Sequence, residues 1–408
     1  MRQRDSIPSF RRLRAFHAAA KANSLSAAAL ALRLSQPALT HSIAQLESAL
    51  GARLFERGPE GAFLNAAGVI FHKRAERFLD QTRGALAGAS GRSADDPAIE
   101  LQAAKLASAQ VRSLLAIWRS GSFRAAARDL GLAEPSLQRP ARDLEQIIGA
   151  PLYRRSAMGL TANEAGAELA RRLALAIGEI HAGAEEIDAV SDARASLRIG
   201  VLALAPRVLL AKAADGALGD GGAQRIEVVE GTYERIARDL NDGALDLVFG
   251  ALRAPPLFPD LIEEPLFEDP YAIVCRRGHP LTALSQATPA DFAPYDWVHP
   301  SAGLPRRAAL DQLTADWGLN PRVRFETNCL ATITSLLSES DRLSILSHWH
   351  VELDDRLARI QHPPILHEPR KIGLMRRGNW LPTPFQQRFL DHFRAEARVT
   401  TTLGAAFG

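Results

Sequence analysis

The chain has 408 residues, with 49 Lys and Arg against 46 Asp and Glu, 47% hydrophobic residues and two cysteines. Because one hydrophobic core stops growing at roughly 250–300 residues, this length predicts two or three domains. The composition excludes a wholly disordered chain and a disulfide framework, and no stretch approaches the ~18 apolar residues of a membrane span. Polar residues interrupt the Ala-rich N-terminal stretch, so we expect no export signal and a cytoplasmic protein.

Charge is distributed unevenly along the chain. Residues 1–57 hold nine basic and three acidic side chains, and residues 101–155 hold nine basic and four acidic ones. Residues 191–408 hold 24 basic and 27 acidic side chains. Two compact basic segments ahead of a slightly acidic body indicate a head that binds a polyanion and a body with another role.

The two basic segments are copies of one another. A shift of 98 residues aligns residues 10–57 with 108–155 without a gap and gives 16 identities in 48 positions. Alanine contributes to that number, but Ser24/Ser122, Pro37/Pro135, Leu46-Glu47/Leu144-Glu145 and Gly51/Gly149 also match. A single long shift is typical of a duplicated domain and excludes a short-period solenoid.

Each copy is predicted to form three helices and a hairpin. In the first copy, Ser24 is a candidate cap for the second helix, and Ser35 caps a third helix that has Pro37 in its first turn. Residues 53–65 can form a basic wing. This pattern predicts a winged helix-turn-helix that carries polar residues to base edges and cations to phosphates. The alternative is a plain three-helix bundle with solvated side chains. The candidate DNA-binding residues of this copy are Ser24, Ser26, Ser35, Gln36, Pro37, Thr40, His41, Arg53 and Arg57.

The second copy departs from the first where bases would be read. Ala133 replaces the capping Ser35, Glu134 replaces Gln36, and Pro140 replaces Ser42 inside the helix. A carboxylate is repelled by phosphates, and an internal proline removes a backbone hydrogen bond. We therefore expect the first copy to read sequence. The second copy either binds the DNA backbone through Arg124, Arg139 and Arg142 or only packs.

The run from Leu13 and Phe16 through Leu34-Ser35-Gln36-Pro37 to Leu54-Phe55-Glu56-Arg57 resembles the DNA-binding domain of LysR-type transcriptional regulators. The second copy resembles the same domain, and the tandem is a departure from the single domain of most members. An Ala-rich amphipathic segment follows each copy, at about 66–89 and 162–190. The resemblance implies that such a linker helix pairs with its counterpart to make a dimer. The alternative is a helix packed on its own domain.

From about residue 196 the pattern changes to alternating strands and helices. Strands at 197–202, 225–230 and 245–250 alternate with helices, and similar alternation over 297–346 predicts a second lobe. A strand from Pro270 crosses into that lobe, and 371–375 returns from it. This half resembles the effector-binding domain of the same family, which is like a periplasmic binding protein.

The resemblance implies a small-molecule effector, and strand ends facing helix N-termini favour an anionic one. Thr232, Ser301 and Ser347 are candidate hydrogen-bond donors, and Arg207 or His299 is a candidate source of charge. Ala205 stands where many members have a hydroxyl. The alternative for each hydroxyl is a helix cap or a turn residue. The candidate effector-binding residues are Ala205, Arg207, Thr232, Gly250, His299, Pro300, Ser301, Thr327 and Ser347.

An enzyme is the rival class of protein. The sequence has no Gly-x-Ser-x-Gly elbow, no Walker loop and no Gly-x-Gly-x-x-Gly, and His348 and His350 have no further ligand at zinc spacing. Cys275 and Cys329 are expected to be buried structural thiols and not a redox pair. We therefore expect no enzymatic activity, no cofactor and no metal. A solute receptor is disfavoured by the missing export signal.

The expected fold is α/β with all-α heads, namely two tandem winged helix-turn-helix domains followed by a two-lobed, periplasmic-binding-protein-like effector domain. The expected protein is a LysR-type regulator that binds double-stranded DNA, a small organic effector and itself, with RNA polymerase as a further candidate partner. The alternative is a cytoplasmic small-molecule-binding protein whose heads serve only for oligomerisation. The expected domains are head 1 at 8–66, a linker helix and joint at 67–98, a degenerate or auxiliary head 2 at 106–162, a linker or dimerisation helix at 163–192, and the effector domain at 196–400.

Overall fold

The computed structural model describes residues 7–58, 61–157, 159–189, 195–219, 223–321, 323–352, 354–363, 365 and 368–405. The chain divides into two compact units at Ala195 and Ser196, called here the N-terminal and the C-terminal unit. None of the helices in the described ranges is long and apolar enough to cross a membrane.

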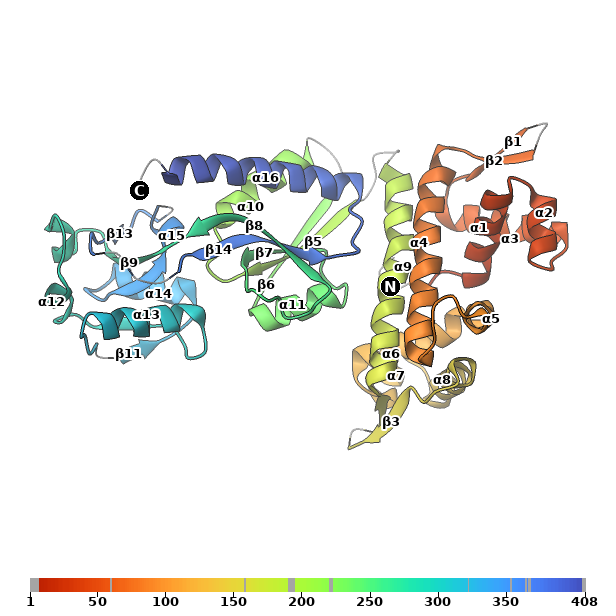
Figure 1. Cartoon of the computed structure of the whole chain (residues 1–408), viewed down its shortest axis with the longest axis horizontal. Coiled ribbons are helices and arrows are strands. Elements are labelled where there is room, and N and C mark those ends of the chain that lie inside the picture. The colour runs from red at the N-terminus through yellow and green to blue at the C-terminus, as the bar shows by residue number, and fades with distance from the viewer. Residues whose placement is uncertain are drawn as a thin grey trace. The chain divides into compact units, whose positions relative to one another are not determined.

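The N-terminal unit contains two heads of the same design (Figure 1). Head 1 consists of α1 (Phe10–Ala22), α2 (Leu25–Ala31), α3 (Gln36–Leu50), β1 (Phe55–Gly58) and β2 (Gly61–Leu64). Head 2 consists of α6 (Ser108–Ser120), α7 (Phe123–Leu130), α8 (Pro135–Ile148), β3 (Tyr153–Ser156) and β4 (Gly159–Ala162). The predicted helices and wing are confirmed in both copies, and most elements begin 98 residues apart.

Matched polar residues tie the third helix of each head to its wing. The Glu47 carboxylate accepts hydrogen bonds from the backbone N–H of Leu54 at 2.7 Å and of Phe55 at 3.3 Å. Glu145 does the same for Leu152 and Tyr153, at 2.8 and 3.3 Å. These bonds satisfy donors at the start of the hairpin, which explains why the Leu-Glu pair is kept in both copies.

A glycine in each head allows the following long helix to pack against the wing. A Cβ atom on Gly68 would lie 2.0 Å from the carbonyl oxygen of Leu54, and one on Gly166 would lie 2.2 Å from that of Leu152. Real side chains do not tolerate such distances, so only glycine fits at these two positions. The matching glycines are therefore explained by a close backbone approach.

The predicted differences between the recognition helices are confirmed. Ser35 accepts a hydrogen bond from the Ala38 N–H at 3.4 Å, whereas the N-cap residue of α8, Glu134, makes no side-chain cap bond. Pro140 lies inside α8 without ending it, and Ser42, at the matching position in α3, donates to the Ala38 carbonyl at 2.9 Å. Helix α8 thus keeps its shape with fewer satisfied backbone groups.

Two long helices follow the heads, α4 (Ala66–Ser90) and α9 (Glu164–Ala189). They pack against each other within this one chain, which corrects the expectation that each linker helix pairs with its counterpart in a second chain (Figure 1). Between α4 and head 2 lies a helix that the sequence analysis missed, α5 (Pro97–Lys105), whose N-cap Asp96 accepts from the Ala98 N–H at 2.8 Å. The joint is therefore only 91–96.

A buried ion network joins α4 to α9. The Arg74 side chain is 3% exposed; its Nη1 donates to Glu179 Oε2 at 2.7 Å and its Nε to Glu186 Oε1 at 2.9 Å. Arg77 and Gln81 also donate to Glu179, at 2.8 and 3.1 Å. A buried guanidinium needs such partners, because its desolvation costs several kcal/mol.

The first lobe of the C-terminal unit is a five-stranded sheet in the order β6-β5-β7-β14-β8. Strands β5, β6 and β7 are parallel, and β14 runs antiparallel to β7 and β8. Helix α11 packs on one face, while α10 and α16 pack together on the other (Figure 1). The elements are β5 (Ser196–Leu202), α10 (Arg207–Leu218), β6 (Arg225–Gly231), α11 (Tyr233–Asn241), β7 (Leu247–Ala251), β8 (Leu261–Asp269), β14 (Arg370–Arg377) and α16 (Pro384–Ala405).

The second lobe contains a three-stranded antiparallel sheet, β12-β9-β13, and the parallel pair β10-β11. The predicted strand from Pro270 is confirmed as β9, and the returning strand as β14. The nine-residue strand β8 was missed, because it alternates irregularly between buried and exposed positions. The elements are β9 (Tyr271–Arg276), the 3-10 helix η2 (Pro280–Ala283), α12 (Pro289–Phe292), β10 (Trp297–His299), α13 (Pro305–Asp316), β11 (Val323–Glu326), α14 (Leu330–Ser338), β12 (Ser344–Ser347), α15 (His348–Glu352) and β13 (Leu357–Arg359).

Removing Arg74 should destabilise the N-terminal unit strongly. Arg74→Ala leaves the carboxylates of Glu179 and Glu186 buried with fewer partners, which costs about 3–5 kcal/mol. Hydrogen exchange in peptides of α4 and α9, measured on the full chain, should accelerate on the order of a hundredfold or more.

The matched control is Arg83→Ala, also in α4. Arg83 pairs with Asp80, but the two side chains are 40% and 56% exposed, so this pair is worth about 0–1 kcal/mol. Equal acceleration of exchange in both variants would contradict the role given to Arg74.

Candidate DNA-binding surface and effector site

Helix α3 presents the residues predicted to contact bases. Gln36, Pro37 and His41 are exposed in its first two turns, and Thr40 is half-buried. The Nε2 atoms of His41 and Gln45 lie 2.7 Å apart, which orders two polar side chains on the same face. A capped helix with polar residues free in its first turns has the geometry that enters a major groove.

The residues around α3 divide between structure and surface. The Ser24 hydroxyl accepts from the Ala27 N–H at 3.3 Å and the Ser35 hydroxyl caps α3, so both act as helix caps here. Ser26 and Arg53 are exposed beside them. Arg57 lies in β1, but its side chain falls outside the described part of the chain.

Head 2 presents arginines on its second helix, its recognition helix and its wing, and only Arg155 of these matches an arginine in head 1, Arg57. Arg139 and Arg142 on α8 and Arg124 on α7 are exposed, as are Arg154 and Arg155 on the wing strand β3. Gln138 matches Thr40 and is half-buried. The surface of head 2 is therefore suited to phosphates, although Asp129, exposed on α7, and the half-buried Glu134 at the start of α8 are acidic.

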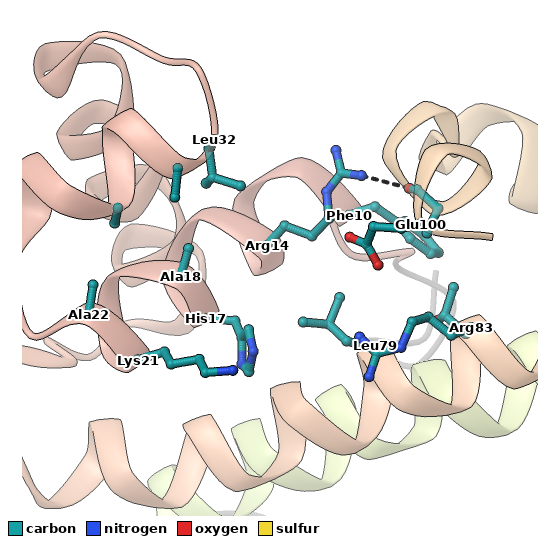
Figure 2. A pocket seen from close by; sticks show the side chains of 14 residues that line it. Phe10, Arg14, His17, Ala18, Lys21, Ala22, Leu32, Leu79, Arg83 and Glu100 are labelled. Carbon is teal, nitrogen blue, oxygen red and sulfur yellow. Dashed lines mark hydrogen bonds between the residues drawn. The ribbon is translucent and has the colours of Figure 1, made fainter. Parts of the chain in front are cut away.

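A pocket of about 460 Å³ lies between α1, α2, α4 and α5 in the N-terminal unit (Figure 2). Arg14 closes one side by donating to the carbonyls of Ala103 and Ala104, at 2.7 and 2.9 Å. The His17 ring lines it and stacks on His72 at 5.1 Å; burial, followed by the His72 charge, lowers the pKa of His17. No sequence motif indicated this pocket, because its walls come from four separate helices.

In the C-terminal unit, a fully buried carboxylate joins the two lobes. Asp269, at the end of β8, accepts from the Ser347 hydroxyl at 2.6 Å and pairs with Arg370 of β14. The Arg370 guanidinium also lies over the Tyr271 ring, 5.3 Å from its centroid. Burial outweighs these partners and raises the pKa of Asp269. Asp269 Oδ1 and Arg370 Nε have no hydrogen-bond partner among the described residues.

Positive charge gathers around His350 of α15. Burial, followed by the charges of Arg370, Arg207 and Arg306, lowers the pKa of the His350 imidazole to about 4. Arg306 is 5% exposed and reaches the carbonyls of Ile345 and Thr327 at 3.4 Å each. Burial lowers the pKa of Arg306 to about 10, and its two hydrogen bonds are long. The charges of three guanidinium groups thus act on one half-buried imidazole, and one of them, Arg370, pairs with the buried Asp269.

Four of the predicted effector residues gather at the ends of β10 and β11. His299 is 4% exposed, and neither of its ring nitrogens has a partner within the described ranges. The Thr327 N–H donates to the His299 carbonyl at 2.9 Å, and the Ser301 N–H donates to Asn328 at 3.0 Å. The Thr327 hydroxyl accepts from the Cys329 N–H at 3.1 Å, and the Pro300 carbonyl accepts from Arg307 at 3.2 Å.

The predicted residues of the first lobe have mostly structural roles. The Thr232 hydroxyl caps α11 by accepting from the Arg235 N–H at 3.4 Å. Gly250 has φ +152°, and a Cβ atom there would lie 2.5 Å from that of Leu202, so close packing explains this glycine. Arg207 pairs with Glu230 at 2.7 Å with both side chains half exposed, and Ala205 is buried.

Sequence reasoning missed Asp269, Tyr271, Arg306, His350 and Arg370 as members of this site. They come from five elements and share no motif. One signal was available, a neighbouring proline at an element end: Asp269 ends a strand directly before Pro270, and Arg306 follows Pro305, the first residue of α13. No group of three or more His, Cys, Asp or Glu side chains suited to a metal occurs among the residues that the structure describes.

The expectation of two buried thiols is wrong for one of them. Cys275 is buried in β9, and burial raises the pKa of its thiol to about 12. Cys329 is exposed at the N-terminus of α14, where hydrogen bonds to Thr332 lower the pKa of its thiol. The sequence pattern did not distinguish a position at a helix N-terminus, where Cys329 lies, from a position in the core.

Acid should destabilise the C-terminal unit through His350. The unfolded chain protonates this imidazole near its ordinary pKa of 6.5, whereas the folded chain does so only near 4, so stability falls as pH drops through this window. His350→Gln should remove about 2 kcal/mol of the loss between pH 7.5 and pH 5. Calorimetry at both pH values measures this, with the exposed His41→Gln as control. The same pH dependence in all three proteins would exclude this role.

Comparison with known proteins identifies both units. The family model "LysR substrate binding domain" matches residues 191–398. The model "Bacterial regulatory helix-turn-helix protein, lysR family" matches twice, at 10–69 and at 108–167. Both heads thus match the same family of DNA-binding domains.

Individual relatives agree with these family matches. The HTH-type transcriptional regulator GalR of Pseudomonas putida is 29% identical over 382 residues, which covers 93% of this chain and 94% of GalR and so takes in both heads. CfxR of Cupriavidus necator is 32% identical over 177 residues, 42% of this chain and 54% of CfxR. The structure of a full-length OxyR variant from Pseudomonas aeruginosa has a TM-score of 0.50 at 16% identity, covering 71% of this chain and 94% of OxyR, and so shares the fold. The chain belongs to the LysR family of transcriptional regulators, with two copies of the family's DNA-binding domain ahead of one effector-binding domain.

Proposed function

We propose that the chain acts in the cytoplasm, binds operator DNA through α3 of head 1 and senses a small organic anion in its C-terminal unit. The observation that carries the DNA-binding role is the capped start of α3, where Gln36 and His41 are exposed. A glutamine side chain both donates and accepts, so it can bind an adenine through two hydrogen bonds. We propose that the whole chain acts by binding DNA and an effector, and we propose no enzymatic activity.

Head 2 is proposed to hold the DNA backbone. Support comes from the exposed cations Arg124, Arg139 and Arg142, which neutralise phosphates without reading bases. Glu134 replaces the glutamine of head 1, and the start of α8 lacks a side-chain cap. These differences favour a supporting role for head 2 over an equal share in sequence recognition.

The effector is proposed to carry a carboxylate or another compact anion. Arg306, Arg370 and Arg207 approach His350, and Asp269 is the buried acid that opposes them. The guanidinium groups of Arg306 and Arg370 are buried, and Arg370 Nε has no hydrogen-bond partner among the described residues, so an anion that supplies a further acceptor is favoured. Both ring nitrogens of His299 and Nδ1 of His350 have no hydrogen-bond partner in the described part of the chain and are further candidate contacts.

Effector binding is proposed to rotate the lobes within a dimer or tetramer and so to change the spacing of the heads of different chains on DNA. Arg207 belongs to the first lobe, whereas His350 and Arg306 belong to the second, so an anion among them would draw the lobes together. A ligand shifts such an equilibrium only through its different affinity for the two arrangements. Self-association through the C-terminal unit and contact with RNA polymerase belong to the same proposal.

Two sets of variants separate the roles of the heads. Gln36→Ala should abolish the preference for the protein's own upstream DNA, since a good base contact contributes about 1–3 kcal/mol of discrimination. Arg139→Ala with Arg142→Ala should weaken binding to all sequences and reduce the slope of log K against log salt by about two. Footprinting and salt titration of the full chain measure both effects.

Arg225→Ala, an exposed cation of the C-terminal unit, is the matched control and should change neither quantity. Equal loss of sequence preference from the Gln36 and the Arg139/Arg142 variants would contradict the ranking of the heads. Affinity that does not respond to salt would contradict phosphate binding altogether.

The effector site is tested with a panel of candidate ligands and with variants of one buried and one exposed arginine. A panel of small mono- and dicarboxylates should contain a compound that raises the melting temperature, because binding stabilises the folded state, while its neutral amide should not. Arg306→Gln should weaken that binding about tenfold or more, since Arg306 is buried among the site residues. Arg356→Gln should leave it unchanged, because Arg356 is exposed and already pairs with Asp354. An unchanged affinity in Arg306→Gln would remove Arg306 from the site.

A further inference from the structure

The pairing of α4 with α9 runs antiparallel within one chain (Figure 1). Arg74, near the start of α4, binds Glu186, near the end of α9. At the other end of the pair, a Cβ atom on Gly88 of α4 would lie 3.7 Å from Nη1 of Arg172 of α9. Contacts that pair early residues with late ones establish opposite helix directions.

This pairing has a local two-fold symmetry. Equivalent residues of the two copies are 98 positions apart, and two equivalent residues can touch only on a two-fold axis. Gln81 and Glu179 are such a pair, and Gln81 Nε2 donates to Glu179 Oε1 at 3.1 Å. The contact of Arg74 with Glu186 has its symmetric counterpart in Arg172 beside Gly88. Two helices of one chain therefore meet in the two-fold arrangement that is typical of the interface of a symmetric dimer.

The charges on the two helices favour the unlike pair. Two α4 helices in this geometry would set buried Arg74 opposite Gln81 and Gly88, neither of which is a carboxylate. Two α9 helices would offer Glu186 to Arg172, but they would also bring the two Glu179 carboxylates together on the axis. If two chains exchanged helices and formed one α4–α4 pair and one α9–α9 pair, the two buried Arg74 guanidinium groups would thus have no carboxylate partner.

The connection between the heads keeps the pair in one chain. The joint of residues 91–96 is short, and α5 contacts both heads. Gln102 donates to the Ile148 carbonyl of head 2 at 3.2 Å, and Arg14 of head 1 donates to the Ala103 carbonyl at 2.7 Å. The starts of the heads also meet, since Ser108 donates to the Pro8 carbonyl at 2.8 Å. Such a tether makes intrachain pairing favourable at any protein concentration.

We infer that a single chain is a complete two-headed DNA-binding unit whose operator has two unlike halves in inverted orientation. Helix α3 reads one half through Gln36, and α8 holds the other half, chiefly through Arg139 and Arg142. In a dimer of identical heads both halves must match, whereas the two heads of this chain differ at the recognition helix. This inference rests on the proposed function of α3.

Cysteine cross-linking tests the intrachain pair. Gly88→Cys with Arg172→Cys, in full-length protein carrying Cys329→Ser, places two accessible thiols across the helix pair. A short bismaleimide should join them within a chain that still migrates as a monomer on a denaturing gel, with a yield independent of concentration. Single-cysteine variants are the controls. Cross-linked products that migrate as dimers would overturn the inference.

Selection from random DNA with the cross-linked and the untreated protein tests the operator. Both should enrich the same sequence-specific half, which depends on Gln36. Footprints on the selected DNA should extend over an adjoining half of variable sequence, and Arg139→Ala with Arg142→Ala should remove that extension. Two identical halves that both depend on Gln36, and neither on Arg139 and Arg142, would overturn the inference and leave the proposed function intact. No enrichment by the untreated protein would instead reject the proposed function, and the inference with it.

Discussion

A guanidinium buried between two carboxylates determines how the N-terminal unit is assembled. Arg74 of α4 has almost no contact with solvent and is held by Glu179 and Glu186 of α9. Apolar stripes on both helices supply most of the contact area, but such stripes pair with many partners. The ion network makes α9 the specific partner of α4. Because α4 follows head 1 and α9 follows head 2, the pair also determines how the two heads are placed within one chain.

Fusing two heads in one chain frees them to differ. The residues that hold each head together are kept, namely Glu47 and Glu145 at the wing and Gly68 and Gly166 beneath it. The residues at the start of the recognition helix are not kept, since Gln36 has become Glu134. The shared contacts preserve a common frame, while the changed ones separate base reading from backbone binding. A symmetric assembly of identical heads cannot make that separation.

The sequence predicts the heads well because the two copies support each other: the shift of 98 residues marks each helix and each wing strand twice. It does not predict which helix α4 pairs with, since Leu169, Leu173, Ile177 and Ile180 form a stripe that suits any matching partner. The sequence names only some of the residues of the candidate effector site. His299 and Ser347 were proposed through the resemblance, whereas Asp269, Arg306 and Arg370 are single residues on separate elements that only the folded chain brings together.

The most direct test of the account is a pulsed electron spin resonance measurement of the distance between α4 and α9 under spin dilution. Nitroxide labels on cysteines at positions 88 and 172, with Cys329 replaced by serine, report on facing positions of the helix pair. Intrachain pairing predicts a single short distance whose signal amplitude per labelled chain is unchanged in a large excess of unlabelled protein. Loss of the short distance on dilution would show that the helices pair between chains and would contradict the account.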